Sequence, residues 1–325
     1  MSTVVRIHQT GGPEVLRVEQ IDPGLPGPGE VRLRHTAIGV NFIDTYLRSG
    51  LYSLPHLPHG LGFAGAGVIE AVGEAVSGFA VGDRVCYGTG PAGSYATERV
   101  MPAAVLIRMP DTLADDIAAG MMLRGMTAQY LIRRLYPVQP GDVVLFHAAA
   151  GGVGEIACQW LKALGATVIG TVGSDEKAEL ARQSGCDHTI VYTRENFKER
   201  VKEITNGVGV AVVYDGVGKA VFEDSLDCLR LRGMMCTYGN ASGPVPPVSP
   251  ITLSQKGSLF LTRPTLAHYT STRAELEATA SELLDVVANG TVKVTIGQSY
   301  PLTEAGRCHQ DLEGRKTVGS TVLLP

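Results

Sequence analysis

VVLFHAAAGGVG, residues 143–154, is an apolar run that breaks into a glycine-rich turn. The segment after it has the apolar spacing of a buried helix face, at Val153, Ile156, Ala157, Trp160 and Leu164. The glycines therefore lie between a strand and the start of a helix, whose first N–H groups are directed at an anion. This order of elements predicts a pyrophosphate site.

The turn matches the dinucleotide fingerprint G-x-G-x-x-G with one departure, because Ala149 stands at the first glycine position. Alanine permits the tight turn if its φ is negative. Gly151 lets the backbone approach a phosphate, and Gly154 lets helix and strand pack closely. On this motif alone, a structural strand-to-helix turn remains an alternative.

The chain that follows repeats the same unit. Strand-like segments alternate with helical ones over residues 167–172, 175–183, 188–192, 195–205, 208–214, 220–229, 233–238 and 258–262. Successive βαβ units predict a doubly wound parallel sheet of the Rossmann type within an α/β fold, with the ligand at the carboxyl ends of the strands.

Cofactor choice is decided at the end of the second strand, where an Asp or Glu holds the ribose of NAD. Gly173 and Ser174 stand there, which leaves room for a 2′-phosphate, and Lys177 follows in the first helical turn. NADPH is therefore favoured over NADH. Two alternatives remain: Asp175 serves the ribose, or Asp175 and Glu176 complement the helix N-terminus while Lys177 is solvated.

The other residues flank this domain. Residues 1–125 show no run of helices, and strand-like segments at 30–40, 65–72 and 82–87 are separated by glycine and proline turns. They predict a mostly antiparallel, barrel-like domain. The C-terminal tail contains a helix over 273–289, strands over 292–296 and 321–324 and a short helix between them, and it is expected to complete that domain. Cofactor and substrate would meet between the domains.

The whole chain resembles the zinc-independent quinone oxidoreductase (zeta-crystallin-like) family of the medium-chain dehydrogenase/reductase superfamily. The segments that carry the resemblance are GVNFID (39–44) with RSG (48–50), VGDRV (81–85), residues 148–154, YDGVG (214–218) and RKT with Gly319 (315–319). The resemblance implies a GroES-like catalytic domain over 1–125 and 265–325, and a Rossmann NADP-binding domain over 126–264. It also implies an NADPH:quinone reductase.

Catalytic zinc in the dehydrogenase branch of this superfamily requires ligands that are missing here. Asn41 stands at the early cysteine position, and Gly60 to Phe63 (GLGF) replace the Gly-His-Glu segment. Six cysteines are scattered without a C-x-x-C pair, and His56 and His59 are expected to be solvent-exposed turn residues. No metal is predicted.

Without a metal, the reaction relies on hydride transfer from the nicotinamide to an acceptor that needs no Lewis acid, which suits quinones and conjugated enones. The resemblance implies that Asn41, Phe42, Ile43 and Asp44 approach the nicotinamide. Tyr46 and Tyr52 are placed to line the substrate cleft, where either phenol would donate a hydrogen bond to a reducing carbonyl. Tyrosines packed at a domain edge are the alternative. The predicted catalytic residues are Asn41, Tyr46 and Tyr52.

The resemblance places further residues around the cofactor. Lys177, Tyr192 and Arg315 would surround the 2′-phosphate, as two cations and a phenol around a dianion. The remaining residues border the nicotinamide ribose, the pyrophosphate, the adenine edge and the carboxamide: Thr127, Tyr130, Gly151, Gly152, Val153, Gly173, Ser174, Val217, Tyr238, Gly239, Asn240, Ala241, Ser242, Pro264, Thr265 and Leu266.

Composition excludes several partner classes. The net charge is −4, with 28 basic and 32 acidic residues mixed along the chain, so no basic patch for nucleic acid is expected. The N-terminus lacks a signal-peptide pattern, and no apolar run is long enough to span a bilayer. A cytoplasmic enzyme with unpaired cysteines is predicted.

The apolar strand at 258–262 is expected at a sheet edge, where it invites pairing with a second copy. A homodimer with a continuous sheet is therefore predicted, the alternative being an edge covered by the C-terminal tail.

Three functions remain open at this point. The first is NADPH-dependent quinone reduction, by hydride or electron transfer. The second is NADPH-dependent reduction of an enone or alkenal on the same scaffold. The third is a non-enzymatic role as an NADPH-binding structural or RNA-binding protein, against which the acidic balance argues.

Overall fold

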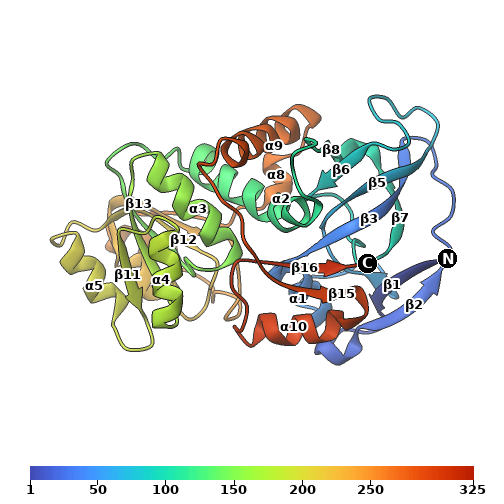
Figure 1. The fold of residues 1–325 in the computed structure, drawn as a ribbon. Helices are drawn as coiled ribbons and strands as arrows, with labels where there is room; N and C mark the ends of the chain where they lie inside the picture. The colour runs from blue at the N-terminus through green and yellow to red at the C-terminus, as the bar shows by residue number, and fades with distance from the viewer. The chain divides into compact units, whose positions relative to one another are not determined.

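The structure is a computed structural model that describes residues 1–325. The chain divides into two compact units (Figure 1). The first comprises Met1–Met126, Thr270–Ser281 and Val294–Pro325, and the second comprises Thr127–Tyr269 and Glu282–Lys293.

The second unit is built on a six-stranded parallel sheet in the order β11-β10-β9-β12-β13-β14. In chain order its strands are β9 (Val143–His147), β10 (Thr167–Val172), β11 (His188–Val191), β12 (Val210–Asp215), β13 (Leu229–Thr237) and β14 (Phe260–Thr262). Numbered from the first, this is the order 3-2-1-4-5-6 of a dinucleotide-binding fold. The predicted Rossmann-type sheet is confirmed, and β14 lies at its edge.

The sheet is stable because its central strands are apolar on both faces. Leu145, Ile169 and Val213 are fully buried in one core cluster, as expected for parallel strands covered on both sides. The helices that connect or follow the strands are α3 (Gly152–Ala163), α4 (Asp175–Gln183), α5 (Phe197–Ile204), α6 (Phe222–Leu226), α7 (Pro250–Gln255) and α8 (Leu266–Tyr269).

The predicted boundary between α6 and β13 was wrong. A helix was expected over 220–229, but α6 ends at Leu226 and β13 already begins at Leu229, where it pairs with Val210. Arg232 then adopts a left-handed φ of 58°, and the pairing of β12 with β13 shifts between Val210 and Val212. The irregularity interrupts the strand pattern in the sequence.

The first unit contains a mainly antiparallel seven-stranded sheet and a small three-stranded sheet. The larger has the order β15-β16-β3-β5-β6-β8, with β7 beside β3, and the smaller has the order β2-β1-β4. The strands are β1 (Ser2–Ile7), β2 (Arg17–Ile21), β3 (Glu30–Val40), β4 (His59–Gly60), β5 (Ala64–Val72), β6 (Arg84–Tyr87), β7 (Glu98–Pro102), β8 (Ile107–Arg108), β15 (Ile296–Pro301) and β16 (Ser320–Leu324). The predicted α/β class with a separate antiparallel part is confirmed.

One helix in the first unit was not expected from the sequence. α1 (Phe42–Ser49) forms because Asp44 accepts a hydrogen bond from the Asn41 backbone N–H, while Gly50 ends the helix with a φ of 83°. A longer helix, α2 (Asp115–Gln129), also begins before residue 125 and continues into a π-helical segment, Tyr130–Leu135.

The C-terminal tail contains α9 (Arg273–Ala288) and α10 (Ala305–Glu313). The strand expected at 292–296 lies instead at β15 (Ile296–Pro301). Val292 donates its N–H to Val286 at the end of α9, and the Gln159 side chain bonds both backbone groups of Lys293. These bonds use the backbone groups that a strand needs. The C-terminal strand β16 pairs with β3 and β15, so it does not extend the six-stranded sheet.

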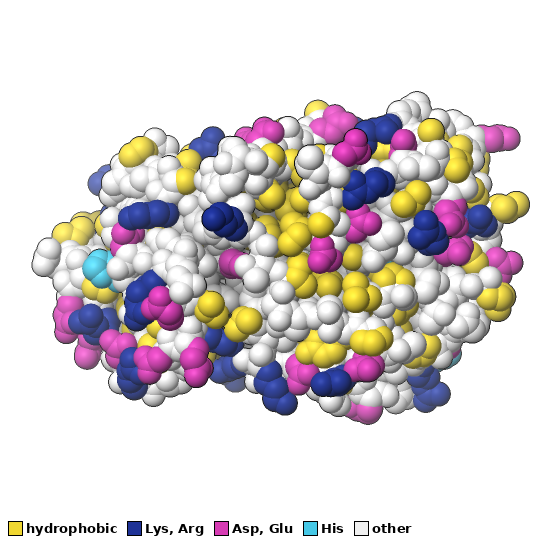
Figure 2. Space-filling model, in the orientation of Figure 1, with side chains coloured by type: hydrophobic (Ala, Val, Ile, Leu, Met, Phe, Trp, Pro, Cys, Tyr) yellow, Lys and Arg dark blue, Asp and Glu magenta, His cyan; other side chains and the backbone are white.

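On the face drawn in Figure 2, charged side chains of both signs are interspersed. None of the helices has the combination of length and apolar character that crossing a bilayer requires.

Candidate functional site

The glycine-rich turn joins β9 to α3. Ala148 takes the left-handed conformation with a φ of 54°, whereas Ala149 is not among the residues with positive φ. The Gly151 N–H donates to Ala148 O at 2.9 Å, and Gly151 caps α3. A Cβ on Gly154 would lie 2.5 Å from Ala149 O, so only glycine lets the helix approach the strand this closely.

A buried histidine supports this turn from within the sheet. His147 Nδ1 lies 2.8 Å from Thr171 Oγ1 on β10, and its Nε2 lies 2.8 Å from Ser225 Oγ on α6. Burial lowers the pKa of His147 to about 3, so the ring is neutral. The side chain fixes the position of the last β9 residue before the glycine loop.

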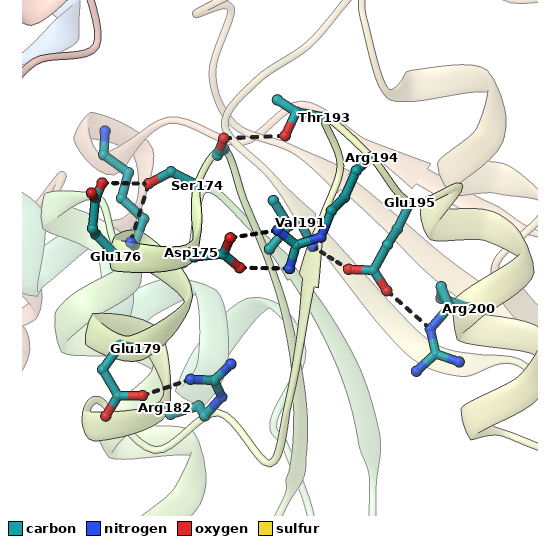
Figure 3. A network of polar contacts seen from close by, with 12 residues as sticks. Ser174, Asp175, Glu176, Glu179, Arg182, Val191, Thr193, Arg194, Glu195 and Arg200 are labelled. Carbon is teal, nitrogen blue, oxygen red and sulfur yellow. Dashed lines mark hydrogen bonds and ion pairs between the residues drawn. The ribbon is translucent and has the colours of Figure 1, made fainter.

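The predicted 2′-phosphate residues of the second unit converge at the carboxyl ends of β10 and β11. Because Val172 pairs with Val191, Gly173 and Tyr192 are neighbours, and a Cβ on Gly173 would lie 2.9 Å from the Tyr192 hydroxyl. Ser174 caps α4, its Oγ accepting the Lys177 N–H at 3.3 Å. Gly173, Ser174, Lys177 and Tyr192 therefore form one cluster, part of which is drawn in Figure 3.

An ion pair beside this cluster was not foreseen from the sequence. Arg194 Nη1 and Nη2 donate to the two carboxylate oxygens of Asp175, each at 2.5 Å (Figure 3). The guanidinium holds the pKa of Asp175 below its usual range. The two residues are far apart in the chain, so only the parallel pairing of β10 and β11 reveals the contact.

Two further loops meet at the carboxyl ends of β12 and β13. Asp215 accepts the N–H groups of Val217 and Gly218 at 2.7 and 2.9 Å, and its carbonyl accepts the Tyr238 N–H. The Ser242 hydroxyl donates to Val217 O at 2.8 Å. Burial raises the pKa of Asp215 to about 6. These hydrogen bonds join the two loops, which contain Val217 and the predicted segment Tyr238, Gly239, Asn240, Ala241 and Ser242.

The other predicted cofactor residues of the second unit lie in two places. Thr127 and Tyr130 are buried, on α2 and its π-helical extension, and the Tyr130 ring stacks on Tyr269 with centroids 4.5 Å apart. Pro264, Thr265 and Leu266 follow β14 and lead into α8, the helix that carries Tyr269.

In the first unit, Asn41 is held by an arginine that sequence reasoning missed. Arg124 on α2 donates from Nε to Asn41 Oδ1 at 3.0 Å, from Nη2 to Val40 O at 2.6 Å and from Nη1 to Gly319 O at 2.9 Å. Its guanidinium is buried. A lone cation within the apolar stretch of α2 was the available sequence signal.

Asp44 begins a directed chain of buried hydrogen bonds. The Tyr95 hydroxyl donates to Asp44 Oδ2 at 3.0 Å, and His309 Nε2 lies 2.9 Å from that hydroxyl. Arg48 donates to His309 Nδ1 and to both Glu313 oxygens. Burial raises the pKa of Asp44 to about 7 and, together with Arg48, lowers the pKa of His309 to about 3.

The predicted substrate-lining aromatic residues of the first unit are brought together. Tyr46 and Tyr52 meet edge to face with centroids 5.3 Å apart, and Phe42 lies 6.3 Å from Tyr46. Ile43 is half-buried on the same helix.

Arg315 follows α10 in the first unit, with a left-handed φ of 58°. No three His, Cys, Asp or Glu side chains converge on a common point. His56 and His59 contact each other, with ring centroids 5.0 Å apart; His56 is exposed and His59 half-buried. All six cysteines are free and buried.

Comparison with known proteins places the chain in a family. A "Zinc-binding dehydrogenase" profile matches residues 152–289, and an "Alcohol dehydrogenase GroES-like domain" profile matches residues 27–111. The chain is 53% identical over 325 residues to a quinone oxidoreductase of Pseudomonas aeruginosa, covering 100% of both chains. It is 51% identical to a 2-haloacrylate reductase of Burkholderia sp., covering 98% of each.

A solved structure is equally similar. The Escherichia coli quinone oxidoreductase complexed with NADPH superposes with a TM-score of 0.98 at 47% identity, covering 99% of this chain and 100% of that one. The similarity extends over both units. The chain belongs to the quinone oxidoreductase family of the medium-chain dehydrogenase/reductase superfamily.

Proposed function

We propose that this chain is an NADPH:quinone oxidoreductase, which transfers a hydride from NADPH to a quinone. The observation that carries the proposal is the cluster of Gly173, Ser174, Lys177 and Tyr192 beside the glycine turn of a Rossmann sheet. The P. aeruginosa relative, matched over its full length, is a quinone oxidoreductase, and the E. coli relative is complexed with NADPH.

The residues present fit this cofactor. Gly154 lets α3 begin close to β9, so that its first N–H groups would face a pyrophosphate, and the lack of a side chain on Gly173 lets the Tyr192 hydroxyl lie against this residue. Lys177 and Tyr192 would hold the 2′-phosphate, joined by Arg315 of the first unit. The loops after β12, β13 and β14 would hold the adenosine and nicotinamide portions.

When bound, NADPH supplies the hydride; the protein supplies position and electrostatics. Arg124 fixes the Asn41 amide, which we propose faces the nicotinamide together with Phe42 and Ile43. Asp44 was expected to approach it as well, but its side chain is fully buried and supports this segment by accepting the Asn41 N–H. Tyr46 and Tyr52 would donate a hydrogen bond to the acceptor oxygen as charge develops on it. The substrate site between the two domains, and the division at residues 125 and 265, remain predictions.

We propose that the reaction proceeds without zinc. At the position of the first zinc-binding cysteine of the dehydrogenases, Asn41 directs its oxygen to Arg124. Gly60 to Phe63 offer no soft or imidazole donor. Activity should therefore be unchanged by a chelator and by added zinc, and loss of activity on chelation would contradict this part of the proposal.

The test of the function is the oxidation of NADPH with 1,4-benzoquinone and 9,10-phenanthrenequinone as acceptors, repeated with NADH. Rapid oxidation of NADPH with a quinone, and slow oxidation of NADH, is the expected result. Tight NADPH binding without turnover of any acceptor would instead favour a non-enzymatic role.

A second candidate reaction is the reduction of an activated alkene. The 51% identity to a 2-haloacrylate reductase favours it, because an alkene conjugated to an acyl group also accepts hydride without a Lewis acid. A simple enone and a 2-haloacrylate belong in the same assay. Turnover of these alone would move the protein to the alkene reductases.

We also propose that the protein is a cytoplasmic homodimer. Strand β14 has one strand neighbour, and Leu231, Ile251 and Phe260 around this sheet edge are 74%, 62% and 59% exposed. Exposed apolar residues at an open sheet edge favour pairing with a second copy. Six free thiols fit a reducing compartment.

A further inference from the structure

The pair of Asp175 and Arg194 lies where Rossmann enzymes distinguish NADPH from NADH. Asp175 is the first residue of α4, two residues beyond Gly173 at the end of the second strand of the sheet. In NAD-binding proteins, a carboxylate from this region accepts hydrogen bonds from the ribose hydroxyls. A free carboxylate here would also repel a 2′-phosphate dianion.

The carboxylate of Asp175 is not free. Both of its oxygens accept from Arg194 at 2.5 Å, in the two-point geometry that matches a guanidinium to a carboxylate. The neighbouring Glu176 accepts the Ser174 hydroxyl at 3.3 Å instead. Arg194 therefore pairs with the first of the two carboxylates that open α4.

The position of Arg194 is built by the loop that follows β11. Its N–H and that of Glu195 both donate to Val191 O, while the Glu195 carboxylate accepts the Val191 N–H and pairs with Arg200 (Figure 3). Thr193 donates to Gly173 O across the two strands. The backbone that carries Arg194 is thereby tied to the strand ends that form the cofactor cluster.

The charges of the cluster show what Arg194 changes. The first turn of α4 carries Asp175 and Glu176 against Lys177, a net charge of one negative unit facing an expected dianion. Arg194 brings this local balance to zero. Its guanidinium donates to both oxygens of the Asp175 carboxylate.

We propose that Arg194 is a positioning residue that determines cofactor specificity: it neutralises Asp175 and so prevents that carboxylate from holding a ribose hydroxyl or repelling the 2′-phosphate. This inference rests on the proposed NADPH-dependent function. Lys177 and Tyr192 would contact the phosphate, and Arg194 acts through Asp175.

The test measures binding by calorimetry with two probes that differ only in the 2′-phosphate, 2′,5′-ADP and 5′-AMP. The ratio of their dissociation constants isolates the contribution of that phosphate. In Arg194→Gln, the preference for 2′,5′-ADP should fall about three- to fivefold, which is the value of an exposed charge contact. The loss should shrink at high salt.

Two further variants separate neutralisation from direct contact. Asp175→Asn should keep or raise the wild-type preference, and Arg194→Gln combined with Asp175→Asn should restore the preference to within about twofold of Asp175→Asn. The matched control is Arg108→Gln, which removes an equally exposed arginine that pairs with Asp83 in the first unit. It should leave the preference within about twofold of wild type.

An unchanged preference in Arg194→Gln would overturn the proposal. So would a double variant that keeps the full loss, because Arg194 would then act on the phosphate itself. A wild-type protein that binds the two probes equally would instead contradict the NADPH-dependent function, so the two failures are distinguishable. Far-UV circular dichroism checks that each variant is folded.

Discussion

Lys177 is the residue at which the cofactor assignment is most directly tested. Its backbone N–H donates to Ser174 Oγ in the first turn of α4, the helix that follows Gly173 at the end of β10. Lys177→Glu should raise the NADPH Michaelis constant about tenfold or more, since a charge-assisted contact contributes roughly 1.5–3 kcal/mol, with little change in turnover. Steady-state kinetics with varied NADPH measures both quantities.

A matched control is the same charge reversal on another helix. Lys202→Glu on α5 alters the net charge equally, and Lys202 is exposed away from the cofactor cluster. It should leave the Michaelis constant close to wild type. If Lys177→Glu behaves like this control, Lys177 does not hold the 2′-phosphate.

Asp44 predicts a particular dependence of stability on pH. Burial raises its pKa from 3.8 to about 7, so the folded protein favours the protonated carboxyl. The contribution of the protonated Asp44 carboxyl to the free energy of unfolding is complete below about pH 4 and is lost as the pH rises towards 7. Asp44→Asn, which stays neutral, should gain stability relative to wild type across this range, by at most about 1.4 kcal/mol per pH unit.

Urea unfolding of both proteins at a series of pH values measures this difference. The control is Asp285→Asn, because Asp285 is an exposed carboxyl on α9. The difference in the free energy of unfolding between Asp285→Asn and wild type should not show the pH dependence expected for Asp44→Asn. A constant difference between Asp44→Asn and wild type from pH 4 to 7.5 would mean that Asp44 is ionised throughout.

At the scale of elements, the Arg124 side chain joins α2 to the Asn41 segment. Arg124 supplies charged donors to Asn41 Oδ1 and Val40 O, which are buried, and to Gly319 O, which is half-buried. Arg124→Met should lower the free energy of unfolding by about 2–4 kcal/mol, because the buried acceptors lose their partners without gaining water. Urea unfolding gives the value.

A neighbouring core substitution calibrates this result. Met122→Leu on the same helix, at a fully buried position, should cost less than about 1.5 kcal/mol. The loss of unfolding free energy in Arg124→Lys should lie between those of Arg124→Met and Met122→Leu, since lysine keeps the charge but lacks the planar guanidinium group. An equal loss of unfolding free energy in Arg124→Met and Met122→Leu would show that the Arg124 hydrogen bonds do not stabilise the position of α2.

The same scale shows what the sequence could predict about the fold. The strands β3 and β10 and the helix α4 have the expected bounds, because their periodicity is clear and a turn or cap ends each one. The helix α1 was missed although its ends are local signals, a capping box between Asn41 and Asp44 and a left-handed Gly50. The position of β15 depends on Gln159, which lies far away in the sequence.

The residues of the candidate site likewise divide into those that the sequence predicts and those that only the folded chain reveals. Residues at strand ends, such as Gly173, Lys177 and Tyr192, could be predicted because a parallel sheet brings the carboxyl ends of its strands to one edge. Arg194 and Arg124 could not, since each acts through a partner that only the folded chain supplies. Side chains that support other side chains leave little signal in a single sequence.

For the whole molecule, the open edge of the six-stranded sheet is the feature that bears on assembly. Phe260 on β14 is 59% exposed, and the strand has no neighbour on its outer side. In a twofold dimer paired through this edge, a substitution acts twice, because each subunit presents the same surface. Phe260→Arg would bring two cations towards an apolar contact.

This variant should shift the protein from dimer to monomer, as measured by sedimentation or light scattering over a range of concentrations. Val81→Arg is the matched control, since Val81 is 62% exposed on the first unit and outside the sheet. It should leave the mass unchanged. A wild-type protein that is monomeric at every concentration would contradict the proposed dimer. A protein that remains dimeric after Phe260→Arg would have its interface on another surface. Because the proposed 2′-phosphate cluster lies at β10 and β11, whereas β14 forms the opposite edge of the sheet, binding of 2′,5′-ADP by the monomeric variant should persist.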